Sequence, residues 1–137
     1  MAKSQLKDFP GAIADFTESI KRGPDHPDAY LSRGMAKSQL KDFPGAIADF
    51  TESIKRGPDH ADAYFNRGMA KYKLKDFPGA IADYTATINF APPHLEDAYE
   101  ARGLAHTALR NEKEATDDFR RAVELRLKSS QPSVTHY

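Results

Sequence analysis

A segment of 34 residues occurs twice in succession in this chain and is the strongest constraint on its fold. Residues 1–34 and 35–68 differ at only three positions. A third copy covers residues 69–103 with one inserted residue, and a degenerate fourth copy begins at Leu104. Repeats of this length are single supersecondary units that bury their apolar faces against neighbouring copies, so we predict a solenoid rather than a globule. Stacked repeats present an extended concave surface, and such surfaces bind other chains.

The balanced charge of the chain argues against several classes of partner. Twenty Lys and Arg residues are matched by 20 Asp and Glu residues, so the formal net charge is zero. Binding to nucleic acid or to anionic lipid needs a basic surface, and the sequence has no basic stripe. The chain has no cysteine, and no apolar run approaches the roughly 20 residues of a membrane span. We therefore expect an intracellular, cytoplasmic protein that binds a protein or peptide, without nucleic-acid binding or membrane insertion.

Each copy has the apolar pattern of two helices. In the second copy, Asp42 is a predicted N-cap and Gly57 a predicted C-cap of one helix. An earlier helix over about residues 28–40 would complete an antiparallel hairpin. The apolar residues of the later helix have the spacings of 3, 1, 3 and 4 that place them on one helix face; they are Phe43, Ala46, Ile47, Phe50 and Ile54.

The same positions resemble the tetratricopeptide repeat. Over 34 residues, the signature of that family is W-x2-L-G-x2-Y, then A-x3-F, then P. The resemblance implies an all-α fold, a right-handed α-solenoid of antiparallel helical hairpins. This chain departs from the signature by having Tyr in place of Trp and Arg in place of Leu. The matching residues of the second unit are Tyr30, Arg33, Gly34, Ala46, Phe50 and Pro58.

The resemblance also implies a single repeat domain over residues 1–128. We expect the first unit to be partial, because its opening helix would start about eight residues before Met1. A polar segment, residues 129–137, is predicted to be a disordered tail. The expected units are about 1–26, 27–60, 61–95 and 96–128.

Three histidines recur at the repeat spacing, His26, His60 and His94. Ligands of one zinc ion must lie within about 2.1 Å of it, whereas equivalent residues of packed helices lie about 8–10 Å apart. We therefore interpret the histidines as turn residues and predict no metal site and no cofactor. Asp117 and Asp118 could suggest acid–base catalysis, but interleaved charges of both signs are typical of a solvated helix face. The chain is not predicted to be an enzyme.

Arginine occupies the family's usual leucine position in three units, at Arg33, Arg67 and Arg102. An arginine at a packed seam needs an anionic partner. That partner is either a ligand or a carboxylate of the chain, and we favour an Arg–Asp pair that ties helices together. The recurring acidic residues of the later helices are Asp49, Asp83 and Asp118.

In the tetratricopeptide family the first helix of each hairpin lines the inner surface, which indicates where a partner would bind. The apolar and methionine-containing lining favours burial of apolar anchors of an extended or helical peptide. The leading prediction is a non-catalytic protein–protein interaction scaffold. The alternative is a self-assembling repeat module, natural, engineered or excised, that forms homo-oligomers through its uncapped ends. The predicted groove residues are Leu31, Met35, Phe65, Asn66, Met69, Tyr72 and Leu104.

Overall fold

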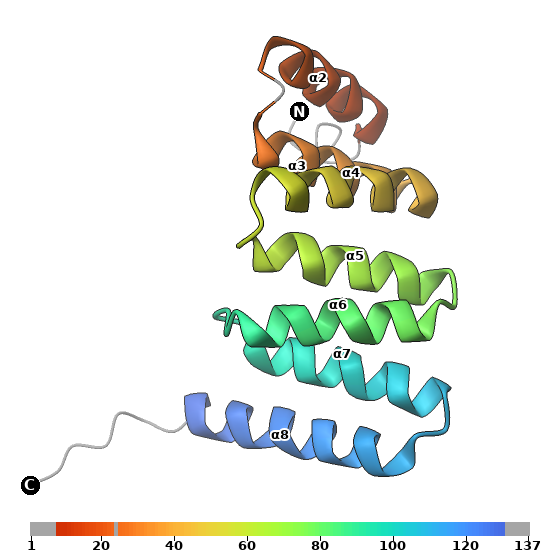
Figure 1. The fold of residues 1–137 in the computed structure, drawn as a ribbon, viewed down its shortest axis with the longest axis vertical. Coiled ribbons are helices and arrows are strands. Elements are labelled where there is room, and N and C mark those ends of the chain that lie inside the picture. The colour runs from red at the N-terminus through yellow and green to blue at the C-terminus, as the bar shows by residue number, and fades with distance from the viewer. Residues whose placement is uncertain (1–7, 24, 131–137) are drawn as a thin grey trace, which may run out of the picture.

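A computed structural model describes residues 8–23 and 25–130, and these residues form a stack of helices (Figure 1). Consecutive helices pack against each other along the whole stack. The prediction of an all-α solenoid is confirmed. The helices of the described residues are α2 (Phe9–Arg22), α3 (Pro27–Gln39), α4 (Phe43–Arg56), α5 (Ala61–Lys73), α6 (Phe77–Asn89), α7 (Leu95–Ala108) and α8 (Glu112–Ser130).

Three antiparallel hairpins make up most of the stack: α3 with α4, α5 with α6, and α7 with α8. Helix α2 lies at one end of the stack and α8 at the other (Figure 1). The first helices of successive hairpins also contact each other directly, α3 with α5 and α5 with α7. These direct contacts between alternate helices place α3, α5 and α7 along one common face.

Aspartate starts the second helix of the repeating unit. The backbone N–H of Gly45 donates to Asp42 Oδ1 at 3.0 Å, which confirms the predicted N-cap. Asp8 and Asp76 accept the same hydrogen bond at the starts of α2 and α6. A proline follows in the first turn of each of these helices, where its missing N–H has no helical partner to lose.

The turn inside each hairpin has a residue in the left-handed region. Lys41, Lys75 and Arg110 have φ of 64°, 65° and 63°. The N–H of Lys41 donates to the carbonyl oxygen of Ser38 at 2.9 Å, and the next N–H donates five residues back, as in a Schellman motif. Non-glycine residues adopt this conformation at a cost of roughly 1–2 kcal/mol. Tertiary packing of the hairpin offsets this cost.

The predicted C-cap at Gly57 is also confirmed in position, since α4 ends at Arg56. Its N–H donates to the carbonyl oxygen of Ser53 at 2.8 Å. With φ of −146°, however, this glycine is in an extended conformation rather than the left-handed one.

Close approach of the two helices in a hairpin requires glycine at one position. A Cβ atom added to Gly34 would lie 2.6 Å from Cε1 of Phe50, closer than real Cβ atoms approach other atoms. Gly68 has the same relation to Tyr84 at 2.7 Å. The aromatic ring of the second helix therefore packs directly on the backbone of the first. This contact explains why the signature pairs a glycine with an aromatic residue 16 positions later.

The core runs as a ribbon along the stack. One cluster joins Ala46 and Phe50 of α4 to Ala70 of α5, and a second joins residues of α6 and α7 in the same way. Small alanines dominate the buried set, because the helices pack closely. Apart from Phe50, Tyr30 and Tyr84, the buried apolar residues are Ala36, Ala46, Ala63, Ala70, Ala80, Ala98, Ala105, Ala115 and Ala122.

The last helix is longer than predicted. It continues to Ser130, so the first two residues of the predicted disordered tail, Ser129 and Ser130, are helical. Their hydroxyls donate to carbonyl oxygens three residues earlier, which satisfies acceptors that the end of the helix leaves open. The rest of the predicted tail and the partial first helix of the first unit lie outside the described residues.

Candidate functional site

A row of exposed apolar side chains runs along the face formed by the first helices. Met35, Met69 and Leu104 occupy the same position in α3, α5 and α7. Their exposed fractions are 46%, 39% and 48%, far above those of the core residues on the same helices. Because the position repeats with each hairpin, the three side chains form a continuous apolar row.

Three hollows lie along this face, and the largest of the three is between α3 and α5, with a volume of about 480 Å³. Volumes of roughly 300–1,000 Å³ are typical of ligand pockets. Side chains of both helices, of the α3–α4 turn and of the start of α4 form its walls. The lining residues are Met35, Ser38, Gln39, Lys41, Phe43, Asn66, Met69, Ala70 and Lys73.

Two smaller hollows join the largest one into a groove. Met35 and Gln39 are shared with a hollow of about 380 Å³ between α2 and α3, whose other walls include Phe9 and Phe16. Met69 and Lys73 are shared with a hollow of about 170 Å³ between α5 and α7. The groove therefore crosses the helices from α2 to α7, as a surface for an elongated partner would.

The structure brings five of the seven predicted groove residues together. Met35, Asn66 and Met69 line the largest hollow, and Tyr72 and Leu104 line the hollow between α5 and α7. The Tyr72 ring also contacts Phe77 edge-on, with the ring centroids 5.1 Å apart.

The other two predicted residues lie deeper in the seams between helices. Leu31 packs against Phe50 and its neighbours in the core. Phe65 packs with its ring centroid 5.7 Å from that of the buried Tyr84. Both side chains are half-buried and line none of the three hollows.

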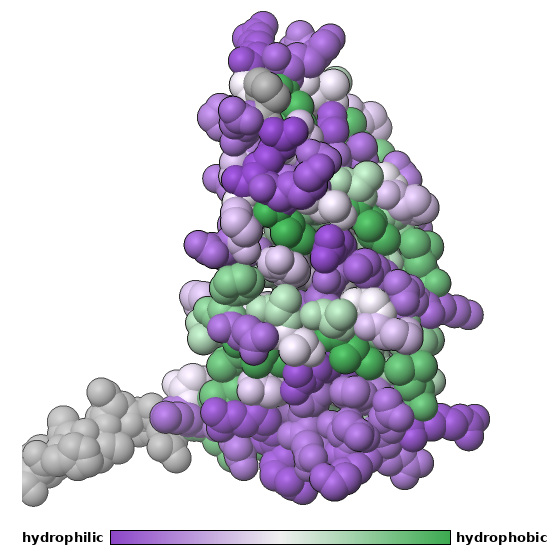
Figure 2. Space-filling model, viewed as in Figure 1, coloured by the Kyte–Doolittle hydropathy of each residue, from purple (hydrophilic) through white to green (hydrophobic). Residues whose placement is uncertain are grey.

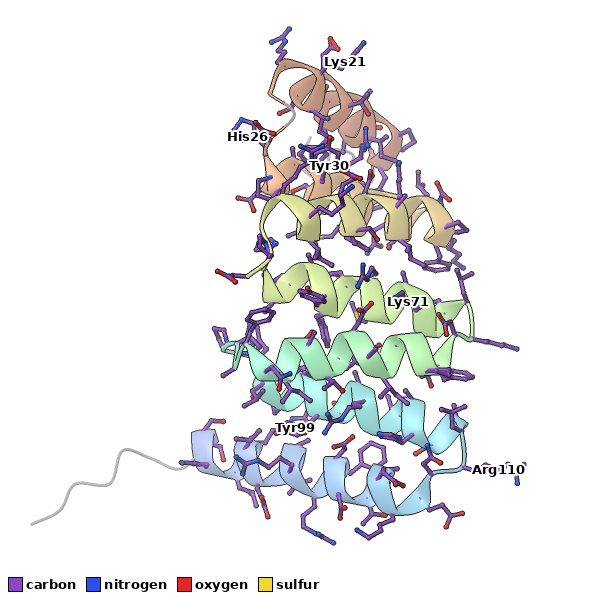
Figure 3. All side chains as sticks on the ribbon, viewed as in Figure 1. Lys21, His26, Tyr30, Lys71, Tyr99 and Arg110 are labelled. Carbon is purple, nitrogen blue, oxygen red and sulfur yellow. The ribbon has the colours of Figure 1, made fainter. Side chains whose placement is uncertain are left out.

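Two residues of the largest hollow lie outside the first helices and were missed by the sequence prediction, Lys41 and Phe43. They belong to the turn and to the second helix, whereas the prediction considered first helices alone. The turn brings them next to the following hairpin. The same turn position in other units is Lys75 and Arg110, and Arg110 projects from the α7–α8 turn in Figure 3.

In each hairpin, a largely buried ion pair joins an arginine of the first helix to an aspartate of the second helix. Arg67 Nε and Nη2 both donate to the carboxylate of Asp83 at 2.8 Å. Asp83 has only 4% of its side chain exposed, and Lys71 Nζ lies 3.2 Å from its second oxygen. Matching pairs join Arg33 to Asp49 and Arg102 to Asp118. The favoured interpretation, an Arg–Asp pair within the protein, is confirmed.

The same arginine also ties each hairpin to the preceding one. Arg67 Nη1 donates to the hydroxyl of Thr51 on α4 at 3.2 Å. Its guanidinium lies 5.6 Å from the ring centroid of Tyr64, within range of a cation–π contact. The hydrogen bond to Asp83 raises the pKa of Arg67 despite the opposing effect of burial. Each nitrogen of the guanidinium thus donates a hydrogen bond inside the stack.

The fourth unit changes one member of this network. His106 replaces the lysine seen at positions 37 and 71, and its Nε2 lies 3.9 Å from Asp118 Oδ2.

In the third unit, Tyr84 occupies the position at which the other units have Phe. Burial raises the pKa of the Tyr84 hydroxyl. Tyr30 and Tyr99 lie within the stack at equivalent positions (Figure 3).

The three repeated histidines immediately precede the first helices. His60 Nε2 lies 3.5 Å from Asp28 Oδ1. Over residues 8–23 and 25–130, no group of three or more His, Asp or Glu side chains is arranged to hold a metal ion. In the same part of the chain, no helix is both long and apolar enough to cross a bilayer.

Comparison with family models identifies the repeat. Models described as tetratricopeptide repeat match residues 2–50, 35–95 and 96–129. These matches cover nearly the whole chain. The chain belongs to the tetratricopeptide repeat family. Membership supports a general role as a protein-interaction scaffold, in agreement with the exposed groove.

Solved structures with the same fold include several of MamA. One MamA crystal structure superimposes with a TM-score of 0.86 at 23% identity, covering 98% of this chain and 73% of that one. A second has a TM-score of 0.74 at 23% identity and covers 94% and 95% of the two chains. MamA from Desulfovibrio magneticus RS-1 gives 0.85 at 20% identity, covering 93% and 72%. A search of curated proteins found no match. At these identities the likeness concerns the fold alone.

Proposed function

We propose that this chain is a non-catalytic scaffold that binds an extended or helical segment of another protein in the groove along α3, α5 and α7. The observation that carries the proposal is the exposed row of Met35, Met69 and Leu104 beside three joined hollows. Flexible thioethers adapt to apolar partners of different shape. A contiguous exposed apolar strip on an otherwise charged protein marks an interaction site.

The hydropathy of the surface varies along the stack. In the view of Figure 2, apolar patches gather along the middle of the stack, whereas the side of α8 turned toward the viewer is strongly hydrophilic. We place the scaffold inside the cell, in the cytoplasm, with a protein or peptide as partner and without a cofactor. The zero net charge of the chain favours this over nucleic acid as a partner.

Peptide selection tests the proposal. A random library of 12-residue peptides displayed on phage is selected on the immobilised chain, and the affinity of the most enriched peptide is measured by fluorescence anisotropy. Met69→Ala should weaken binding by roughly 2 kcal/mol, the scale of an interface hot spot. Leu40→Ala is the matched control, since Leu40 is exposed to a similar extent (47%, against 39% for Met69) but lines none of the hollows. Equal affinities for the two variants would contradict groove binding.

Phe65→Ala adds a second control. Because Phe65 packs on Tyr84, this substitution should lower the free energy of unfolding as well as peptide affinity. Circular dichroism during urea unfolding separates the two effects. A loss of affinity without a loss of stability would mean that Phe65 contacts the partner directly.

A second candidate function, self-association, is supported by the end of the stack at α2. Asp15 and Ser19 are exposed on α2, whereas the identical positions of α4, Asp49 and Ser53, are covered by α3. A first helix from a second copy could cover α2 in the same way. At the other end, Val123 and Leu127 of α8 are exposed, with exposed fractions of 52% and 60%.

Light scattering across a concentration series tests self-association. We expect dimers or larger species, and we expect association to fall when a copy of residues 27–34 is added ahead of Met1. That extension supplies the Tyr-x2-Arg-Gly part of a first helix next to a segment that repeats residues 35–41. A monomer mass at every concentration up to the millimolar range would exclude this candidate.

A further inference from the structure

The charged side chains that line the hollow between α3 and α5 are all positive. Its nine lining residues include two cations, Lys41 and Lys73, and no carboxylate. The remaining lining residues are apolar or carry neutral hydroxyl or amide groups. In a chain with zero net charge, two ammonium groups on one apolar hollow make a local excess of positive potential.

These two lysines differ from the lysines behind the groove. Lys37 Nζ lies 3.1 Å from Asp49, and Lys71 Nζ lies 3.2 Å from Asp83. Within residues 8–23 and 25–130, neither Lys41 nor Lys73 has a carboxylate within 4.0 Å. Asp42, beside Lys41 in sequence, instead accepts the N-cap hydrogen bond at the start of α4. The ammonium groups of the hollow are therefore available to a partner.

The pair of lysines is specific to this hollow, although Lys73 also lines the hollow between α5 and α7. The residue that corresponds to Lys73 is Gln39 in α3 and Ala108 in α7. The lysine that corresponds to Lys41 in the next hairpin, Lys75, does not line the hollow between α5 and α7. Of the three hollows of the groove, only the one where the α3–α4 turn faces the end of α5 has two lysines in its lining.

Asn66 adds a polar contact to the same wall. One amide hydrogen of Asn66 is used, because Nδ2 donates to the carbonyl oxygen of Asp62 at 2.8 Å. Its carbonyl oxygen and second amide hydrogen remain free to pair with the backbone of a bound segment. The corresponding residues of the neighbouring first helices are Ser32 and Ala101, so this amide is also particular to the hollow.

We infer that the α3–α5 hollow accepts an apolar side chain of the partner that has an aspartate or glutamate beside it. The apolar side chain packs on Met35, Phe43 and Met69, and the acidic side chain pairs with Lys41 or Lys73. This inference rests on the groove function proposed above and names the chemistry of its partner. Opposite charge across an interface favours the correct partner and its orientation more than it adds affinity.

Selection from the same random 12-residue library tests the chemistry directly. On the unmodified chain, the enriched peptides should have Asp or Glu within two positions of an apolar anchor several-fold more often than the unselected library. Selection on a Lys41→Met/Lys73→Met variant should remove that enrichment and keep the apolar anchor. Methionine retains an apolar stem of similar length and removes only the charge. Lys75→Met is the matched control, since it removes a lysine from the same turn position outside the hollow.

A selected peptide and its Glu→Gln analogue then give the size of the effect. At about 50 mM salt, where exposed charges are weakly screened, the Gln analogue should bind roughly 3–10-fold more weakly. The difference should disappear in the Lys41→Met/Lys73→Met variant and persist in Lys75→Met. The inference would be overturned if the enriched peptides had an apolar anchor without acidic residues, or if the two analogues bound with equal affinity. Either result would leave the proposal of groove binding intact. Enriched peptides whose binding is unaffected by Met35→Ala/Met69→Ala would instead refute the groove itself.

Discussion

Helices α2 and α4 have the same 14 residues in the same order, yet they differ in what they bury. Both start with an aspartate that accepts a hydrogen bond from a glycine N–H at 3.0 Å. Both end at an arginine followed by a glycine with nearly identical backbone angles. In α4, however, four side chains are buried, whereas α2 has none. The caps are a local property of the sequence, and burial is not.

The neighbours of the two helices explain the difference. Helix α4 packs between α3 and α5, whereas among the described residues α2 packs mainly against α3. The side chains of α4 that meet α3 include Asp49, Phe50 and Ser53, whereas Ala46 joins Ala70 of α5 in the core. Three pairs of matched substitutions, one in each helix, can therefore separate what a residue contributes locally from what its tertiary partners contribute.

The largest difference is expected for phenylalanine. Phe50 is fully buried against Gly34, so Phe50→Ala should cost about 3–5 kcal/mol of unfolding free energy. Phe16 is only partly covered, and Phe16→Ala should cost less than half as much. Urea unfolding followed by circular dichroism measures both. Similar costs would mean that α2 is covered in solution as fully as α4.

Aspartate should show the next largest difference. Asp49→Ala leaves Arg33 and Lys37 without their carboxylate and should cost about 2–3 kcal/mol, less than a fully buried pair because 17% of the Arg33 side chain is exposed. Asp15→Ala, on the exposed face of α2, should change stability by at most about 0.5 kcal/mol.

The pH dependence of the Asp49→Ala effect gives a further check. The hydrogen bond to Asp49 raises the pKa of Arg33 above its ordinary value. A raised pKa means that the arginine's contribution to stability is fully present below the ordinary pKa of arginine and is lost only at still higher pH. The cost of Asp49→Ala should therefore stay constant between about pH 6 and 9. A cost that falls within that range would show that another group controls the pair.

Serine should give the smallest of the three differences. Ser53 is buried, and its hydroxyl donates to the carbonyl oxygen of Pro27 at 2.9 Å, which links the end of α4 to the start of α3. Ser53→Ala should cost about 1 kcal/mol. Ser19→Ala should be nearly neutral, since Ser19 is exposed. If the Ser53 variant were also neutral in thermal unfolding, the link to Pro27 would contribute nothing to stability.

Only some of the groove residues could be predicted from the sequence. Met35, Met69 and Leu104 could be assigned to it because they repeat at one helix position. Leu31 and Phe65 lie on the same helices but pack against the apolar clusters that contain Phe50 and Tyr84 of the second helices. Lys41 and Phe43 line the groove because the α3–α4 turn places them beside the next hairpin. The apolar periodicity of one helix does not predict where a turn places its residues.

The sequence by itself determined the repeat, the hairpin, the capping residues and the family, because each depends on spacing along the chain or on contacts between residues a few positions apart. Tertiary structure alone decided which copy of an identical helix is buried and which residues share a hollow. It also decided that Arg67 pairs with Asp83 in its own hairpin and reaches Thr51 in the previous one. Burial and ion pairing depend on which helices are brought together, and identical sequences with different neighbours cannot encode that difference locally.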